Sequence, residues 1–226
     1  MDGIIITDRC EMFDMHGQVP DAYPPGHVYI IGGKKPEYSV VMYIVQAVTR
    51  RMPDHYYIAG KYSDLWEERI REQTSDRLDV EIFNFKDSLQ DLADEMVKWY
   101  LGQWQPRCYL YYDDRSKAEI FEEAVHQGIQ NYRDQICEKL KRLGVFEFKY
   151  FGLDFVFSIG EDGDVLLGRI GHIEKCADLD AALDVPAFSD WTMFRLWHKV
   201  EKQADHWLRE MEEHISENNN DCGDEE

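Results

Sequence analysis

The chain has 226 residues, of which 44% are apolar and 13% aromatic, so it can bury a hydrophobic core and global disorder is excluded. Its formal net charge of −20 repels phosphates and anionic lipids, which disfavours direct binding to nucleic acid or to membrane surfaces. The apolar runs are too short to span a bilayer and the acidic N-terminus lacks the basic region of a secretory signal, so we expect a cytoplasmic protein.

Strands and helices are predicted to alternate along the first part of the chain. Residues 4–7 read as a short strand, and the Pro- and Gly-rich segment 8–27 is expected to be irregular. Hydrophobic periodicity then predicts, in order, strand 27–33, helix 37–52, strand 55–61, helix 64–74, strand 79–85, helix 87–103, strand 107–114 and helices 116–130 and 132–143. Ser63 or Asp64 is expected to cap the helix over 64–74.

This alternation predicts the fold class. Apolar strands joined by amphipathic helices form a mainly parallel sheet with helices on both faces, because the crossovers are right-handed. We therefore expect an α/β fold with a Rossmann-like, doubly wound sheet over residues 1–144.

The pattern changes after residue 144. Two apolar runs, 145–159 and 164–175, flank a Gly-Glu-Asp-Gly segment, and an Asp-Gly pair between such runs predicts a C-terminal β-hairpin. A long C-terminal helix is expected over 189–215.

The long helix should be capped by Ser189 or Asp190, and its aromatic stripe is expected to pack on the parent domain. Dimerisation through this helix is the alternative. Residues 145–216 would then be an appendage of the first domain, and 217–226 a disordered acidic tail.

The cysteines indicate neither a disulfide framework nor a zinc site. There are five of them, widely spaced and without a CxxC pair, so we expect reduced and mostly buried thiols and no metal site.

Glycines and charged residues follow three of the predicted strands, where doubly wound sheets bind their ligands. Glycine lets a ligand approach the backbone, and lysines and a helix N-terminus attract a phosphate. The alternative is a tight turn with solvated lysines, because neither GxGxxG nor a Walker loop is present. The candidate ligand-binding residues of these segments are Gly32, Gly33, Lys34, Lys35, Gly60, Lys61, Arg115 and Ser116.

Asp113 and Asp114 are the candidate catalytic residues, since adjacent carboxylates at a strand end can hold a divalent metal or act as an acid/base pair. The alternative is an aspartate that caps the following helix.

Residues 28–128 resemble the C-terminal, nucleotide-sugar-binding half of GT-B glycosyltransferases. The matching segments are VYIIGGKKPE, PDHYYIAGK, DVEIFNF and YYDDRSKAEIFEEAVHQG. The resemblance implies that Lys34 or Lys35 contacts the diphosphate and that Glu123 contacts the ribose. Arg115 stands where the family has a second acidic residue.

Two functions are compatible with these patterns. The first is a small-molecule binder, with a nucleotide or nucleotide-sugar-like ligand at the strand ends, a divalent metal accompanying the nucleotide, and transferase activity as the finer hypothesis. The second is a non-enzymatic protein whose acidic surface occupies a basic site on a partner protein, as a nucleic-acid mimic or inhibitor would. Lysines 34, 35 and 61 clustered around a cleft would favour the first function, and scattered lysines the second.

Overall fold

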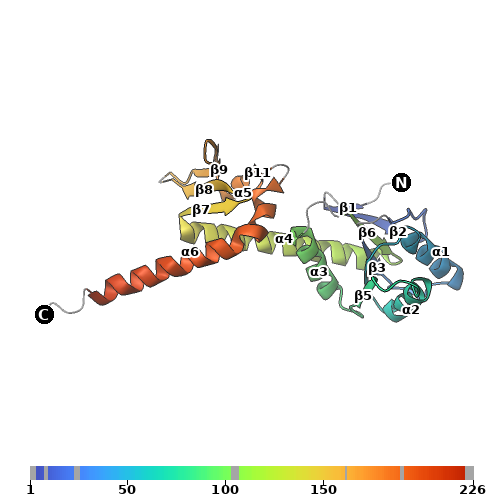
Figure 1. Ribbon diagram of the computed structural model, residues 1–226. Helices are drawn as coiled ribbons and strands as arrows, with labels where there is room; N and C mark the ends of the chain where they lie inside the picture. Colours follow the sequence, from blue (N-terminus) through green and yellow to red (C-terminus); the bar gives the residue numbers. More distant parts are fainter. Residues whose placement is uncertain are drawn as a thin grey trace. The chain divides into compact units, whose positions relative to one another are not determined.

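The computed structural model describes residues 4–7, 10–22, 26–102, 107–160, 162–188 and 191–221. The chain forms two compact units, a first unit of residues 1–129 and a second unit of residues 130–226. Each unit has its own sheet, and the boundary lies within helix α4 (Arg115–Leu143) (Figure 1).

The first unit is built on a six-stranded sheet in the order β1-β2-β6-β3-β4-β5. Five neighbouring strands run parallel, and β1 pairs antiparallel with β2 at the edge. This confirms the predicted α/β fold of Rossmann-like type. The strands are β1 (Ile4–Thr7), β2 (Cys10–Asp14), β3 (Gly26–Ile31), β4 (His55–Ala59), β5 (Glu81–Asn84) and β6 (Arg107–Tyr112).

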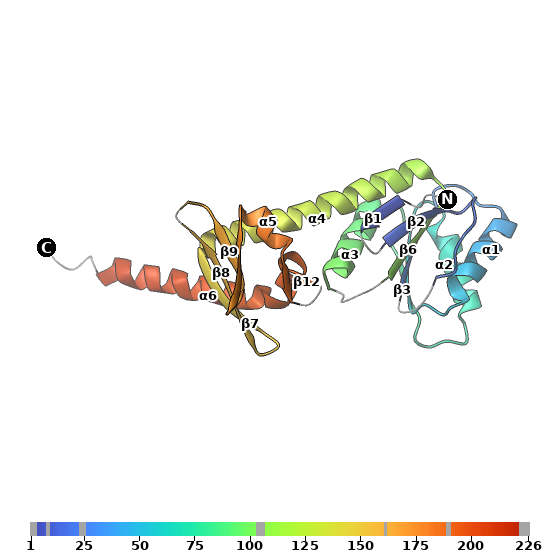
Figure 2. The same cartoon turned by 90° about the horizontal axis from the view of Figure 1, so that it is seen from above.

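Helices cover both faces of this sheet (Figures 1 and 2). Side chains alternate along a strand, so Val28 and Ile30 of β3 face one way and Tyr29 and Ile31 the other. The first pair packs under α1 (Tyr38–Thr49) and α2 (Ser63–Gln73), and the second under α3 (Leu89–Gly102) and the first half of α4.

The order of the strands reverses at β3. The chain moves outward from β3 to β4 and β5, and α3 then returns it to β6 on the other side of β3. The loops that follow β3 and β6 therefore diverge, and this switch point is where open α/β sheets bind ligands.

Three local predictions for the first unit were wrong. The segment 8–27 is not irregular throughout, because it contains β2, in which Cys10 and Met12 are buried in the sheet core. The two helices expected over 116–143 are the single helix α4, since no proline interrupts the run. Neither Ser63 nor Asp64 caps α2, whose N-cap residue is Tyr62 without a side-chain cap bond.

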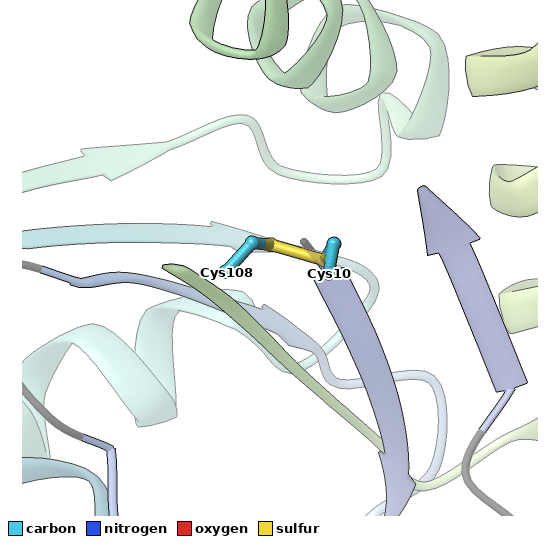
Figure 3. The surroundings of a disulfide bond; sticks show 2 residues. All are labelled: Cys10 and Cys108. Atoms are coloured by element: carbon cyan, nitrogen blue, oxygen red, sulfur yellow. A yellow bond between two sulfur atoms is a disulfide. The ribbon is translucent and has the colours of Figure 1, made fainter. Parts of the chain in front are cut away.

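The prediction of reduced thiols is wrong for two cysteines. Cys10 and Cys108 are opposite each other on the parallel strands β2 and β6, with Cα atoms 4.3 Å apart, and form a disulfide (Figure 3). Both are buried, as expected. Wide spacing along the sequence concealed this pair, because 98 residues separate two positions that the sheet makes neighbours. Among the cysteines that the structure describes, Cys137 and Cys176 form no disulfide.

The second unit contains a four-stranded antiparallel sheet in the order β10-β9-β8-β7. Its buried face packs against the C-terminal helix, where Trp197 and Trp207 contact Phe146 edge-on. The elements after α4 are β7 (Val145–Tyr150), β8 (Leu153–Ile159), β9 (Val165–Arg169), β10 (His172–Cys176), α5 (Leu179–Leu183), β11 (Pro186–Phe188), β12 (Trp191–Thr192) and α6 (Met193–Asp221).

The predicted single hairpin is a meander of three hairpins. The expected turn is present, with Gly163 N donating to Gly160 O. Each apolar run is itself divided by a turn that the sequence analysis missed, at Phe151-Gly152 and at Ile170-Gly171. Phe151 and Gly152 both have positive φ, as the two central residues of a type I′ hairpin turn require.

The long C-terminal helix is present but shifted along the chain. The strand pair β11–β12 precedes it, so α6 begins at Met193 rather than near residue 189. It continues to Asp221, so residues 217–221 are helical where a disordered tail was expected. Ser189, Asp190 and residues 222–226 lie outside the described residues. Among the helices that the structure describes, none is long and apolar enough to cross a membrane.

Candidate functional site

The ends of β3, β4 and β6 are joined by backbone hydrogen bonds. Gly32 N donates to Ala59 O at 2.8 Å, and Tyr62 N donates back to Gly32 O at 3.0 Å. On the other side, Asp113 N donates to Ile31 O at 3.4 Å. The starts of the loops after the three strands are therefore held next to one another at the C-terminal edge of the sheet, at the switch point.

Asp113, the first residue after β6, anchors the loop that follows β3, residues 32–34, which we call the glycine loop. Its Oδ1 accepts hydrogen bonds from Gly33 N at 2.7 Å and from Lys34 N at 3.1 Å. The side chain is only 4% exposed, and Oδ2 has no hydrogen-bond partner among the described residues. An unpartnered buried carboxylate oxygen is costly, so we expect a proton, a water molecule or a ligand group to meet Oδ2.

Burial raises the pKa of the Asp113 carboxyl above its ordinary value, and the charge of Asp114 acts in the same direction. The two loop amides and His16 oppose this shift. His16 follows β2 and was missed by the sequence analysis, because its segment was read as irregular. Recognition of β2 would have placed His16 at the same edge of the sheet as Asp113. A buried acid with a raised pKa is typical of sites where protons are held or moved.

The two glycines after β3 are required by close packing. A Cβ on Gly32 would lie 2.6 Å from the indole ring of Trp66, and a Cβ on Gly33 would lie 2.8 Å from Asp114 Cβ. The amides of Gly33 and Lys34 already donate to Asp113, so a carboxylate of the chain occupies the position that a phosphate would take. These contacts support the tight-turn alternative for this loop.

Gly60, after β4, has a similar structural role. Its φ of 102° lies in the left-handed region, and a Cβ would lie 2.6 Å from Gly32 O. Glycine at this position lets the β3 and β4 loops approach each other.

Lys34, Lys35 and Lys61 are exposed at this edge, and none forms an ion pair with a described residue. Two other lysines of the same region are paired, Lys86 with Asp64 and Lys117 with Asp87. The positive charge of Lys34 contributes to a lowered pKa of Asp114, after the larger effect of the Ser116 hydroxyl. Three exposed lysines at one edge of a strongly acidic chain are suited to attract an anion.

The remaining predicted residues belong to helix α4. Asp114 Oδ1 accepts hydrogen bonds from the backbone N and the Oγ of Ser116, at 3.1 and 2.9 Å, which is the geometry of a helix cap. Arg115 pairs with Glu119 at 2.9 Å. Glu123 is exposed and lies eight residues after the helix begins, about 12 Å along its axis, so the structure does not bring it to the glycine loop.

The two aspartates at the strand end thus have different roles. Asp114 is engaged as a cap, and one oxygen of Asp113 has no partner among the residues that the structure describes. Within the part of the chain that the structure describes, no group of three or more His, Cys, Asp or Glu side chains is placed to hold a metal ion.

No protein family, curated protein or solved structure matches this chain.

Proposed function

We propose that the first unit binds a small nucleotide-like ligand at the C-terminal edge of its sheet, between the loops that follow β3 and β6. The observation that carries this proposal is the free Oδ2 of Asp113, a buried carboxylate oxygen without a partner among the described residues. A ligand hydroxyl or amino group that donates to Oδ2 would remove the cost of this unpaired atom.

The positive charges at this edge indicate that the ligand also carries an anionic group, in addition to the hydroxyl or amino group that donates to Asp113. The amides of Gly33 and Lys34 are occupied by Asp113, so a phosphate would be held by lysine side chains instead of by the glycine loop. Lys34, Lys35 and Lys61 are exposed cations at this edge that form no ion pair with any described residue. A nucleotide supplies both features, a sugar or base that donates hydrogen bonds and a phosphate that pairs with lysine.

Isothermal titration calorimetry of the full chain against a nucleotide panel, with and without Mg²⁺, tests this function. We expect at least one nucleotide to bind, and Asp113→Asn to weaken that binding by about 10- to 100-fold, because a charged acceptor is lost. The double variant Lys34→Ala/Lys35→Ala should also weaken binding and reduce its dependence on salt.

Lys98→Ala is the matched control, because Lys98 is an exposed lysine of α3 that pairs with Glu95 on the same helix. The control should bind like the wild type. If no nucleotide binds under either condition, or if Asp113→Asn binds as tightly as the control, the proposal fails.

Nucleotide-sugar transfer is the finer proposal, taken from the resemblance to GT-B glycosyltransferases. The parallel α/β sheet and the positions of Lys34 and Lys35 at its edge support it. The ribose contact of Glu123 is not supported, because that side chain lies well along α4. We therefore expect Glu123→Gln to leave nucleotide affinity unchanged in the same titration.

The net charge of −20 favours a second candidate function, the binding of a basic surface on a partner protein. The measurement is capture of basic proteins by the immobilised chain at low and high salt. Capture that does not weaken as salt rises would argue against an electrostatic interface.

A further inference from the structure

The turns of the four-stranded sheet in the second unit carry apolar residues at one end of the sheet only. Successive turns of a meander alternate between its two ends, so the turns at Phe151-Gly152 and Ile170-Gly171 lie at the same end. Phe151 is 77% exposed and Ile170 is 60% exposed. The turn at the opposite end has the sequence Gly-Glu-Asp-Gly-Asp (residues 160–164), without an apolar residue. We call the end with Phe151 and Ile170 the apolar end of this sheet.

Phe151 occupies a backbone position that suits its side chain poorly. Its φ of 49° lies in the left-handed region, which a bulky residue adopts rarely and at a cost in free energy. Such a turn favours Asn-Gly, because asparagine accepts positive φ more readily. Tyr150 contacts Phe151 edge-on, with ring centroids 4.7 Å apart, but most of the Phe151 side chain stays in solvent. A residue that is unfavourable for the turn and also exposed indicates that its side chain has a use outside the fold.

The β7–β8 hairpin projects from this end of the sheet. Phe155 of β8 is opposite Arg169, which forms the last pair of the β9–β10 hairpin with His172. The β7–β8 hairpin continues beyond this level to the pair of Tyr150 with Leu153. Its turn therefore extends about 7 Å further than the β9–β10 turn, since an antiparallel strand rises about 3.4 Å per residue. Figure 2 shows this hairpin reaching past the neighbouring strands.

Cations lie next to both turns of the apolar end. Lys149 and Arg169 are exposed, and the exposed His172 follows the second turn. Asp154 is the single carboxylate within two positions of either turn in the sequence, and it lies 3.3 Å from Lys149 Nζ. Around the two turns, two cations thus stand against one carboxylate, in a chain whose net charge is −20.

We propose that the apolar end of this sheet docks on the surface of a phospholipid bilayer. The Phe151 ring enters the boundary between head groups and acyl chains, and Lys149 and Arg169 contact lipid phosphates. Tyr150 combines an apolar ring with a hydroxyl, which suits the depth of the head groups. A projecting tip with cations behind it matches a planar surface that is anionic outside and apolar inside, whereas a partner protein would have to offer a groove.

The charge of the whole chain and the charge of the tip act over different distances. The net charge of −20 opposes approach to anionic lipids from afar, which is why the sequence alone disfavours membrane binding. At about 0.15 M salt, charges further away than about 8 Å are largely screened. The cations beside the two turns therefore dominate once the tip touches the surface.

Co-sedimentation of the full chain with phosphatidylcholine vesicles, with and without about 30% phosphatidylserine, tests the proposal at about 0.15 M salt. We expect weak, reversible binding to the mixed vesicles, because few side chains are inserted. Phe151→Asn should weaken this binding about tenfold or more, since transfer of the phenylalanine ring out of water is lost. Lys149→Met and Arg169→Met should each weaken it about fivefold.

Phe151→Asn also separates docking from folding. Because asparagine accepts positive φ, this variant should have the same free energy of unfolding in urea as the wild type, or a higher one. Val145→Thr is the matched control, because Val145 is an exposed apolar residue of β7 that pairs with Ser158 at the opposite end of the sheet. The control should bind vesicles like the wild type. The proposal is overturned if the wild type binds neither kind of vesicle, if Phe151→Asn binds as well as the control, or if Phe151→Asn is clearly less stable than the wild type.

Self-association is the competing use of an apolar tip. Sedimentation equilibrium of the wild type and of Phe151→Asn detects it, and a dimer that only the wild type forms, without binding to vesicles, would overturn the membrane assignment. Asp113→Asn should bind vesicles like the wild type, because Asp113 belongs to the first unit and this sheet to the second. Loss of vesicle binding in Asp113→Asn would contradict the assignment to the apolar end.

Discussion

Replacement of Asp113 tests how far the stability of the glycine loop depends on a single carboxylate. In Asp113→Ala the amides of Gly33 and Lys34 lose their acceptor at a partly buried turn. Each buried donor left unsatisfied costs about 1–3 kcal/mol. Removal of the carboxylate also removes the cost of burying it, which is the cost that raises its pKa, and this offsets part of the loss from the two amides. We expect the free energy of unfolding of the first unit to fall by about 2–4 kcal/mol.

Asp113→Asn separates the two roles of this side chain. Its carboxamide oxygen can still accept from both amides, so we expect a change in stability within about 1 kcal/mol of the wild type. The same variant should show the weakening of nucleotide binding expected above.

Urea unfolding, combined with hydrogen exchange of peptides covering β3 and the loop after it, measures both effects locally. The reasoning is refuted if Asp113→Ala is within about 0.5 kcal/mol of the wild type, or if Asn destabilises as much as Ala. Either result would mean that the loop is held mainly by packing against Trp66 and α4.

Two further predictions concern the sheet core. Burial, and then the neighbouring His55, lowers the pKa of His27 to about 4 from an ordinary value of 6.5, so its stabilising effect is full above pH 6.5 and is lost as pH falls towards 4. The free energy of unfolding, measured with urea, should therefore fall between neutral and acidic pH by about 1–3 kcal/mol more in the wild type than in His27→Phe, and an equal fall in both would contradict this. Reduction of the Cys10–Cys108 disulfide, which closes a 98-residue separation, should lower stability by about 2–4 kcal/mol. The variant Cys10→Ser/Cys108→Ser should have the same free energy of unfolding as the reduced protein, and added reductant should not change it. A wild-type stability that does not respond to reductant would rule out the disulfide.

The fold of the first unit was largely predictable because its strands are continuous apolar runs. In β3 and β4 nearly every residue is buried, and α1 carries its buried residues at helical spacing. The pattern of apolar residues in the sequence therefore matched the pattern of burial in the fold. β2 was missed because it is an outer strand of the parallel set, in which only alternate residues are buried. Its short pattern could not be distinguished from the polar and Pro-rich residues around it.

The meander of the second unit was only half predictable, for a reason of turn chemistry. Asp-Gly at residues 162–163 is a common turn pair and was recognised. Phe151-Gly152 makes an equally tight turn, but phenylalanine rarely adopts positive φ, and an apolar residue within an apolar run carries no turn signal. The sequence therefore predicted two long strands where four short ones exist.

The candidate site shows a related limit. Sequence could place Gly33, Lys34 and Asp113 at the same edge, since the carboxyl ends of parallel strands meet there. It could not show that Asp113 reaches across and binds the amides of the other two, because that depends on β6 lying directly beside β3.

This contact changes what the glycine loop can do. A loop with free amides binds a phosphate through its backbone, and any lysines nearby only add to the attraction. Here the amides of Gly33 and Lys34 donate to Asp113, so the proposed ligand would be recognised by groups without a partner among the described residues, which are Asp113 Oδ2 and the side chains of three lysines. Recognition by flexible side chains should be more sensitive to salt than recognition by a rigid loop. A nucleotide affinity that stays constant as salt rises would therefore place the phosphate on backbone amides, and would require Asp113 to release Gly33 and Lys34 when the ligand binds.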